Sequence, residues 1–172
     1  MSSTEASTSW NDIDSEQIVI SGIAGRFPDS DNVNKLRENL FNKLYLVRAD
    51  HERWKLDHPE IPSKMGTINN INKFDANFFG LSFEQAHTLS PEARMLLEYS
   101  HEAIIDAGIN PKQLRGKDTA VIMATSYTEF QKFSLYNTTQ LGGHNIIGCS
   151  KSTLANMISY HFDLKGPSYV VD

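Results

Sequence analysis

Two short stretches contain residue types that bind phosphates or metals in other proteins. Gly22 and Gly25 lie at the end of an apolar run, where a phosphate-binding loop would follow a strand. The third glycine of a dinucleotide-binding loop and the Gly-Lys-Ser/Thr of a phosphate loop are absent, so a structural turn explains these glycines better. His101 and Glu102 start like a zinc-protease helix, but Ile105 takes the place of the second histidine. Because one imidazole cannot hold zinc alone, we predict no metal and no cofactor.

Cys149 is the only cysteine, and it precedes a predicted helix. The dipole of a helix N-terminus stabilises a thiolate, which makes Cys149 a candidate nucleophile. A single cysteine is also a common small buried hydrophobe, and the pattern does not separate the two roles. One cysteine rules out an internal disulfide framework and fits a reducing compartment.

The composition is that of an ordinary globular protein with an acidic balance. Hydrophobic residues make up 40% and charged residues 22%, values that favour one folded domain over disorder. The net charge is −5 and the sixteen basic residues are scattered, which argues against a nucleic-acid partner. No run is long enough to span a membrane, and the polar N-terminus lacks the parts of a secretory signal. We therefore predict a cytoplasmic protein without a membrane partner.

The elements that position these residues alternate between strands and helices. Apolar β-type runs predict strands at 17–23, 119–124 and 168–171, with 119–124 buried on both faces. Apolar residues at three- and four-residue spacing predict helices at 32–44, 90–107 and 150–162. Residues 1–15 are too polar to bury, residues 48–72 show no period, and residues 126–148 receive no assignment. This order predicts an α/β architecture with a layered sheet.

Start and stop signals are clearest for the helix at 90–107. Ser90 is a typical N-cap, Pro91 suits the first position, and Glu92 places an acid in the first turn. Gly108 supplies the stop. This helix is therefore the most sharply bounded element in the sequence.

The strand at 168–171 follows Gly166 and Pro167, a pair that ends the preceding element. In open α/β folds, chemistry takes place just beyond the carboxyl ends of such strands. The sequence stops directly after this strand, and from this we expect a fragment and not a complete enzyme.

Five stretches, in order, resemble the β-ketoacyl synthase domain of multifunctional fatty acid and polyketide synthases. They span 20–28, 74–80, 90–98, 102–108 and 166–172, and shorter stretches at 53–54, 85–88 and 108–111 look closest to animal-type fatty acid synthase. The residues that we assign to the family motifs, with structural roles, are Phe74, Asp75, Phe78, Phe79, Gly80, Pro91, Arg94, Glu98, Gly166, Pro167 and Asp172.

The resemblance implies a thiolase-like fold, layered α/β/α/β/α, of which residues 16–172 would be the incomplete N-terminal part. It also implies an acyltransferase of fatty acid biosynthesis, which condenses an enzyme-bound acyl chain with malonyl on an acyl carrier protein. The implied partners are the acyl carrier protein domain and the acyl and malonyl thioesters, and the complete domain would be a homodimer.

In this family the position of Asp172 leads into a Thr-Ala-Cys motif whose cysteine attacks the acyl thioester, and two later histidines assist. Because none of these three residues occurs here, the resemblance implies no catalytic residue in this sequence and leaves Ile147 and Cys149 as lining of an acyl tunnel or dimer contact. Ser90 and Met157 depart from the aspartate and arginine that are usual in the family. A truncated, non-catalytic paralogue that binds an intact synthase is the alternative.

Overall fold

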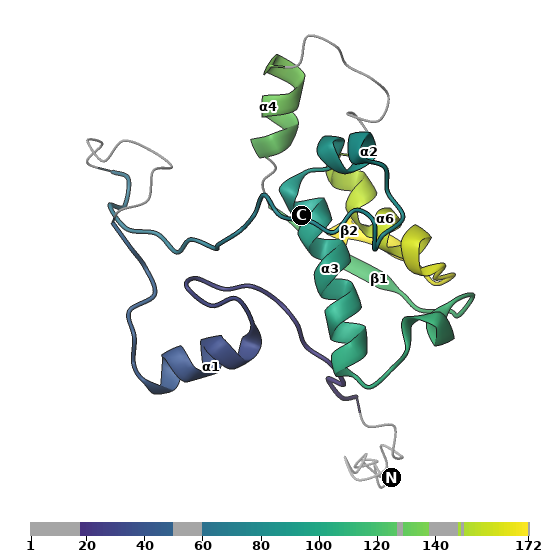
Figure 1. Cartoon of the computed structure of the whole chain (residues 1–172), viewed down its shortest axis with the longest axis horizontal. Coiled ribbons are helices and arrows are strands. Elements are labelled where there is room, and N and C mark those ends of the chain that lie inside the picture. The colour runs from purple at the N-terminus through teal and green to yellow at the C-terminus, as the bar shows by residue number, and fades with distance from the viewer. Residues whose placement is uncertain (1–17, 50–59, 127–128, 138–147, 149, 172) are drawn as a thin grey trace, which may run out of the picture.

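Two short parallel strands form the sheet of this chain. A computed structural model describes residues 18–49, 60–126, 129–137, 148 and 150–171 (Figure 1). Strand β1 (Val121–Ala124) pairs with β2 (Ser168–Val171) so that Val121 lies opposite Ser168 and Ala124 opposite Val171. Between the strands the chain forms α4 (Glu129–Asn137), the 3₁₀ turn η3 (Lys151–Thr153) and α6 (Leu154–Phe162), part of the crossover that a parallel pair requires.

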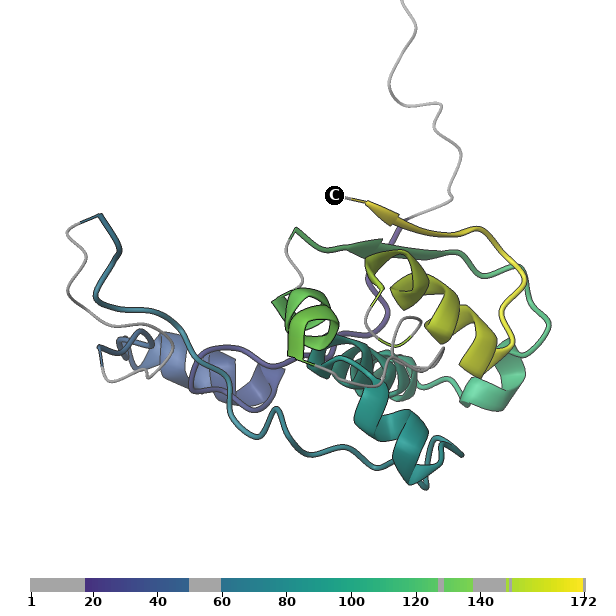
Figure 2. The ribbon, with the colours of Figure 1, turned by 90° about the horizontal axis from the view of Figure 1, so that it is seen from above.

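Helices cover one face of this pair. Figure 2 shows α6 against the strands and α3 (Pro91–Asp106) beneath α6, so that sheet, α6 and α3 follow one another as layers. Apolar side chains between these layers form the core, which consists of Phe79, Leu89, Ala93, Leu97, Leu154, Ile158, Phe162 and Leu164. The predicted α/β layering and the predicted helix at 150–162 are both confirmed.

The bounds of α3 follow from local signals, as predicted. The Ser90 hydroxyl accepts a hydrogen bond from the N–H of Ala93 at 3.1 Å, and Pro91 occupies the first turn. Gly108 lies just beyond the helix with φ +74°, a conformation that glycine adopts without strain. The 3₁₀ turn η2 (Pro111–Leu114) follows and leads the chain to β1.

Helix α2 (Phe83–Thr88) was not predicted, although the sequence contains a signal for it. Ser82 and Gln85 form a capping box: the Ser82 hydroxyl accepts from the Gln85 N–H at 3.2 Å, and the Gln85 side chain accepts from the Ser82 N–H at 2.9 Å. The spacing of serine and glutamine just before a helix is the pattern that would have located it.

The strand predicted at 17–23 is wrong for the residues that the structure describes there. Residues 18–23 have no strand partner among the described residues, and the side chain of Ile20 is 87% exposed. The segment instead runs along α3, where the Ile23 N–H donates to the Asp106 carboxylate at 2.9 Å. A Cβ at Gly22 would overlap the carbonyl oxygen of Ala103, so this glycine permits the close approach to the helix. Gly22 is therefore structural, as predicted, but it serves a close contact with α3 and not the predicted turn, since no turn is assigned to residues 22–25.

The prediction that β1 is buried on both faces is also wrong. Val121 and Met123 pack against the core, but Ile122 on the opposite face is 60% exposed. Its neighbour across the pair, Tyr169, is 49% exposed, as is Val171 one pleat further on. We call Ile122, Tyr169 and Val171 the open sheet face. Helices cover only the other face because no further layer occurs among the described residues.

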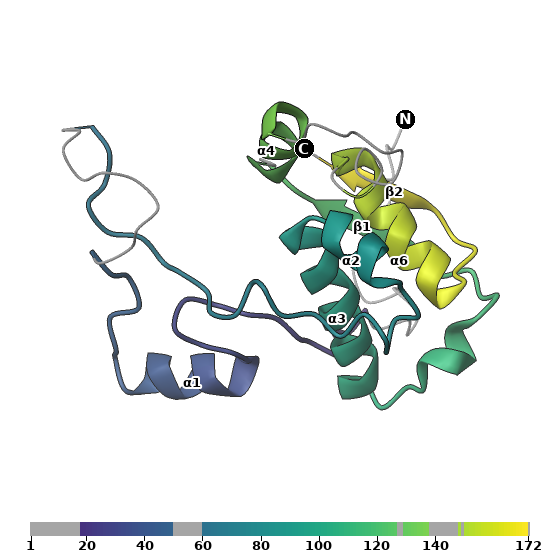
Figure 3. The same ribbon diagram turned by 45° about the horizontal axis from the view of Figure 1, so that its top comes forward.

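Helix α1 (Val33–Phe41) confirms the element predicted at 32–44, but its apolar stripe is not buried. Leu40 and Phe41 are exposed, and the buried side chain is that of Asn39. Its amide donates to the Asp29 carbonyl at 3.1 Å and to the Ser30 hydroxyl at 2.9 Å. Figures 1 and 3 show α1 apart from α3 and the sheet, which explains why its apolar side chains find little to pack against.

Residues 60–72 contain neither helix nor strand, as predicted for 48–72, and α4 lies within the stretch 126–148 that received no assignment. Within the described ranges, no helix is long and apolar enough to cross a membrane.

Candidate functional site

A large cavity lies beside the carboxyl end of β1. The two strand ends are held together by a hydrogen bond from the Thr125 N–H to the Val171 carbonyl at 3.1 Å. The cavity has a volume of about 1130 Å³ and is bounded by the end of β1, the first half of α3, residues 65–71 and α4. Figure 3 shows α4 beyond the end of β1. This edge is where α/β folds place their ligands.

The wall of this cavity is mainly apolar. Met95 and Leu96 come from α3, Phe130 and Phe133 from α4, and Met123 from β1. An apolar cavity of this size with a few polar groups is typical of a small-molecule site. We refer to it as the strand-end cavity.

Three polar atoms in this lining are buried and have no hydrogen-bond partner in the described part of the chain. They are Nε of Arg26, Oε2 of Glu92 and the hydroxyl of Tyr99. The Arg26 guanidinium is otherwise held by the Asn69 carbonyl, which accepts from Nη1 at 2.6 Å. Burial raises the pKa of Tyr99, an effect that the charge of Arg26 partly offsets. Buried polar atoms without partners are costly, so these three atoms lower the stability of the wall of the strand-end cavity.

The predicted motif residues at 74–80 form a structural unit and not part of this cavity. Phe74 stacks on Phe79 with ring centroids 5.3 Å apart, and Phe79 is buried in the core. The Asp75 carboxylate accepts from the Phe78 N–H at 3.0 Å, while the Asp75 N–H donates to the Glu98 carboxylate at 3.4 Å. These contacts attach the segment to α3, and Gly80 then turns the chain with φ +65°.

The other predicted motif residues lie on α3 and before β2. Pro91 lines the strand-end cavity, and Nε of Arg94 is buried without a partner among the described residues. A Cβ at Gly166 would lie 2.5 Å from the backbone of Thr119, and the Pro167 carbonyl accepts from the Val121 N–H at 2.8 Å. Gly166 and Pro167 therefore bring β2 into register beside β1.

Asp172, Ile147 and Cys149 lie outside the described residues. Gly148, the described residue between Ile147 and Cys149, is buried, and its carbonyl accepts from the Ser90 N–H at 2.9 Å at the start of α3. A Cβ at Gly148 would lie 2.5 Å from the carbonyl oxygen of Thr88. Residue 148 is thus held close to the end of α3 that borders the strand-end cavity.

The two departures from the family pattern have clear local surroundings. Ser90 acts as N-cap of α3 and is buried, so its hydroxyl does the work that an aspartate would do. Met157 is partly buried and packs against the core, where its thioether side chain replaces a cation by an apolar group.

The sequence did not single out Arg26 or Tyr99, which only the fold brings to one cavity. It did flag His101, whose ring packs edge-on against Phe78 with centroids 4.9 Å apart. Across the parts of the chain that the structure describes, no group of three or more His, Cys, Asp or Glu could hold a metal ion.

A family model described as the N-terminal domain of β-ketoacyl synthase matches residues 15–172. The chain belongs to the β-ketoacyl synthase family. Over 157 residues it is 45% identical to a fatty acid synthase of Anser anser anser, which covers 91% of this chain and 45% of that relative. It is 34% identical over 181 residues to a probable polyketide synthase of Dictyostelium discoideum, covering 94% of this chain and 7% of that protein. The chain therefore spans less than half the length of these relatives.

Solved ketosynthases share its fold. A ketosynthase from the bacillaene polyketide synthase of Bacillus amyloliquefaciens is similar with a TM-score of 0.74 and 29% identity, over 89% of this chain and 27% of that one. A ketosynthase from module 6 of the Bacillus subtilis bacillaene synthase gives a TM-score of 0.72 at 28% identity, over 88% and 25%. The β-ketoacyl synthase chain thus has the thiolase-like fold that the resemblance implied, and it corresponds to the N-terminal portion of that fold.

Proposed function

We propose that this chain is the N-terminal part of the condensing domain of an animal-type fatty acid synthase, a 3-oxoacyl-[acyl-carrier-protein] synthase. The identity of 45% to a fatty acid synthase, against 32–35% for several polyketide synthases, supports the fatty acid branch. Residues 16–172 constitute this part and residues 1–15 precede it. Acyl and malonyl thioesters on an acyl carrier protein are its proposed substrates, and a homodimer its proposed assembly.

The observation that carries this proposal is the strand-end cavity. Its volume of about 1130 Å³ and its apolar wall suit an alkyl chain, and its place at the carboxyl end of β1 suits a reacting group. From the family resemblance, we propose that Ile147 and Cys149 line an acyl tunnel or a dimer contact. The motif residues at 74–80, with Arg94 and Glu98, support the cavity wall from behind α3.

Filling the cavity tests this assignment. Met95 lines the cavity without belonging to the core, so Met95→Trp should weaken binding of a long-chain acyl thioester about tenfold and leave a short-chain thioester unaffected. Tyr160→Trp, at an exposed position of α6, is the matched control. Binding to the purified chain would be followed by calorimetry. An equal loss of affinity for the long-chain and the short-chain thioester would contradict an acyl-binding role. An equal loss of affinity in Met95→Trp and Tyr160→Trp would contradict it as well.

These 172 residues contain no Thr-Ala-Cys motif, so we propose that they do not condense by themselves. A nucleophile and its helpers act as a unit, and removing the nucleophile removes most of the rate acceleration. Carbon dioxide release from malonyl and acyl carrier proteins should stay at the level of buffer; release above it would show that another residue serves as nucleophile.

A second candidate function is an interaction module that pairs with an intact synthase. The observation that favours it is the open sheet face, on which Ile122, Tyr169 and Val171 are apolar and exposed. Ile122→Lys should abolish co-purification with an intact fatty acid synthase if this face is the contact. Failure of the unaltered chain to co-purify would dismiss this function.

A further inference from the structure

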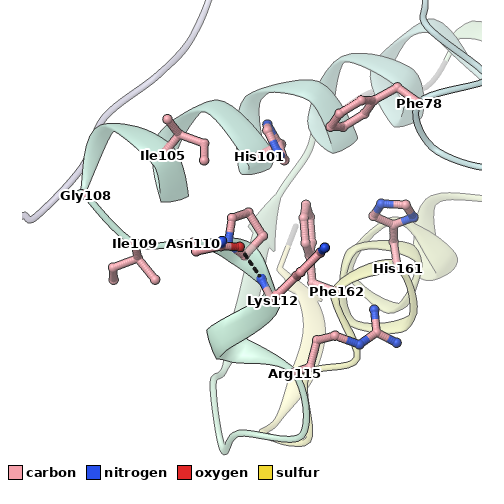
Figure 4. A pocket seen from close by; sticks show the side chains of 11 residues that line it. Phe78, His101, Ile105, Gly108, Ile109, Asn110, Lys112, Arg115, His161 and Phe162 are labelled. Carbon is pink, nitrogen blue, oxygen red and sulfur yellow. Dashed lines mark hydrogen bonds between the residues drawn. The ribbon is translucent and has the colours of Figure 1, made fainter.

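A second cavity lies on the other side of the described unit, between the second half of α3 and α6. Its volume is about 600 Å³, and the turn η2 closes one end (Figure 4). Phe78 and Phe162 form an apolar wall, and Phe78 is 56% exposed although it packs edge-on against His101. None of the residues of the strand-end cavity takes part in this lining. The two cavities are therefore separate sites.

Basic groups gather at this cavity. Lys112 comes from η2, Arg115 follows η2, and His101 and His161 come from α3 and α6. In Figure 4 the side chains of Lys112, Arg115 and His161 lie around the same opening. Of the residues described as lining it, none is acidic, although the chain as a whole carries a net charge of −5. Lys112 and Arg115 thus bring two permanent cations to one opening of an acidic protein.

Lys112 and Arg115 have no acidic partner in the part of the chain that the structure describes. The ammonium group of Lys112 and the guanidinium group of Arg115 make no ion pair or side-chain hydrogen bond with any residue that the structure describes. The charge of Arg115 helps to lower the pKa of Asp163, but this carboxylate forms its ion pair with Lys165, at 2.6 Å. Burial lowers the pKa of His161, and the nearby charges of Arg115 and His101 lower it further. Uncompensated positive charge therefore concentrates on this opening.

An oxyanion would compensate this charge. Arginine presents a planar fork of donors that matches carboxylate and phosphate oxygens, and lysine adds a point charge. The adjacent phenylalanine wall would be covered by an apolar group on the same molecule. We propose that this cavity binds an organic anion with an apolar body, the oxyanion head group lying on Lys112 and Arg115 and the body against Phe78 and Phe162. This inference does not depend on the proposed condensing function.

Binding of simple amphiphiles to the whole chain tests the proposal. Octyl phosphate and octanoate supply the head group and the body together, inorganic phosphate supplies the head group alone, and octanol supplies the body alone. We expect the two amphiphilic anions to bind at least about tenfold more tightly than either part, with an affinity that falls as salt is added. Tighter binding of octyl phosphate would identify a phosphate ester as the natural head group, and tighter binding of octanoate a carboxylate.

Variants then locate the site. The double variant K112Q/R115Q should reduce affinity for the tighter amphiphile at least about tenfold. Lys117→Gln, an exposed lysine outside the cavity, should have no such effect. Circular dichroism would show that both variants fold, and shifts of the His161 ring in NMR spectra of the unaltered chain give an independent readout. The proposal is overturned by equal losses in both variants, by octanol or phosphate binding as tightly as the amphiphiles, or by no binding at millimolar concentration.

Discussion

At the scale of single residues, His161 shows how packing changes an ordinary titrating group. Its ring lies 4.9 Å from that of Phe79 and 5.0 Å from that of Phe162, so the imidazole is surrounded by aromatic side chains. Burial disfavours the charged form, and the positive charges of Arg115 and His101 act in the same direction. The folded chain therefore holds His161 neutral at a pH where the unfolded chain already protonates it.

This difference predicts how stability depends on pH. Because the folded pKa lies below the ordinary value of 6.5, the contribution of His161 is fully present above that pH and is lost as pH falls through the folded pKa. The thermal midpoint should thus decline on acidification from neutral pH. Asp163 would titrate in a lower pH window, because its hydrogen bond from Lys165 lowers the pKa of that carboxyl.

His161→Gln should flatten this decline, and differential scanning calorimetry across the range would measure it. His87→Gln, on the exposed side of α2, is the control and should leave the slope unchanged. An unaltered slope in the His161 variant would assign the pH dependence to other groups.

At the scale of elements, the caps decide where helices begin. Ser90 is buried, and its hydroxyl satisfies the Ala93 N–H, which has no partner within the helix. The same residue donates its own N–H to the Gly148 carbonyl and so joins α3 to the segment that precedes α6. The hydroxyl of this serine therefore stabilises an element that borders the strand-end cavity.

Ser90→Ala should reduce the free energy of unfolding by about 1 kcal/mol, because the cap is lost and a buried N–H remains. Ser90→Asp, which restores the family's usual residue, should change it by only a few tenths, about the spread among good caps. Urea unfolding followed by circular dichroism would measure both. If Ser90→Ala left the free energy of unfolding unchanged, water would cap α3 as well as the serine hydroxyl does.

At the scale of the whole molecule, the described structure is one-sided. Helices α3 and α6 lie on one side of the parallel pair (Figure 2). The open sheet face carries the exposed side chains of Ile122, Tyr169 and Val171. Exposed apolar sheet surface and unpaired strand edges promote association. The same feature motivates the interaction module named above.

We therefore predict that the isolated chain associates with itself as its concentration rises. Ile122→Lys should shift sedimentation toward the monomer, because a charge on this face must stay hydrated. Tyr160→Lys replaces a residue that is 90% exposed on the far side of α6 and should leave association unchanged. A chain that stays monomeric at every concentration would show that the open sheet face does not self-associate.

The sequence alone predicted those elements whose start and stop signals are local. Ser90, Pro91 and Gly108 bound α3 through hydrogen bonds and backbone angles that span a few residues, so their order along the chain specifies the helix. The order of the family stretches likewise identified the fold class, since it is a property of the chain and not of its packing. Helix α2 belongs with these elements, because its Ser82–Gln85 capping box is a local signal in the sequence that could have predicted it.

Tertiary structure alone decided which faces are buried and which distant residues meet. An apolar run at 17–23 is typical of a strand, but a strand needs a partner strand for its backbone hydrogen bonds. Here the Ile23 N–H instead donates to the carboxylate of Asp106, 83 residues away in the sequence. Periodicity places apolar side chains on α1 and β1 without saying whether another layer covers them, so the exposure of Phe41 and Ile122 could not be foreseen. The meeting of Arg26 with Tyr99, and of Lys112 with His161, arises from long-range packing, which no local spacing encodes.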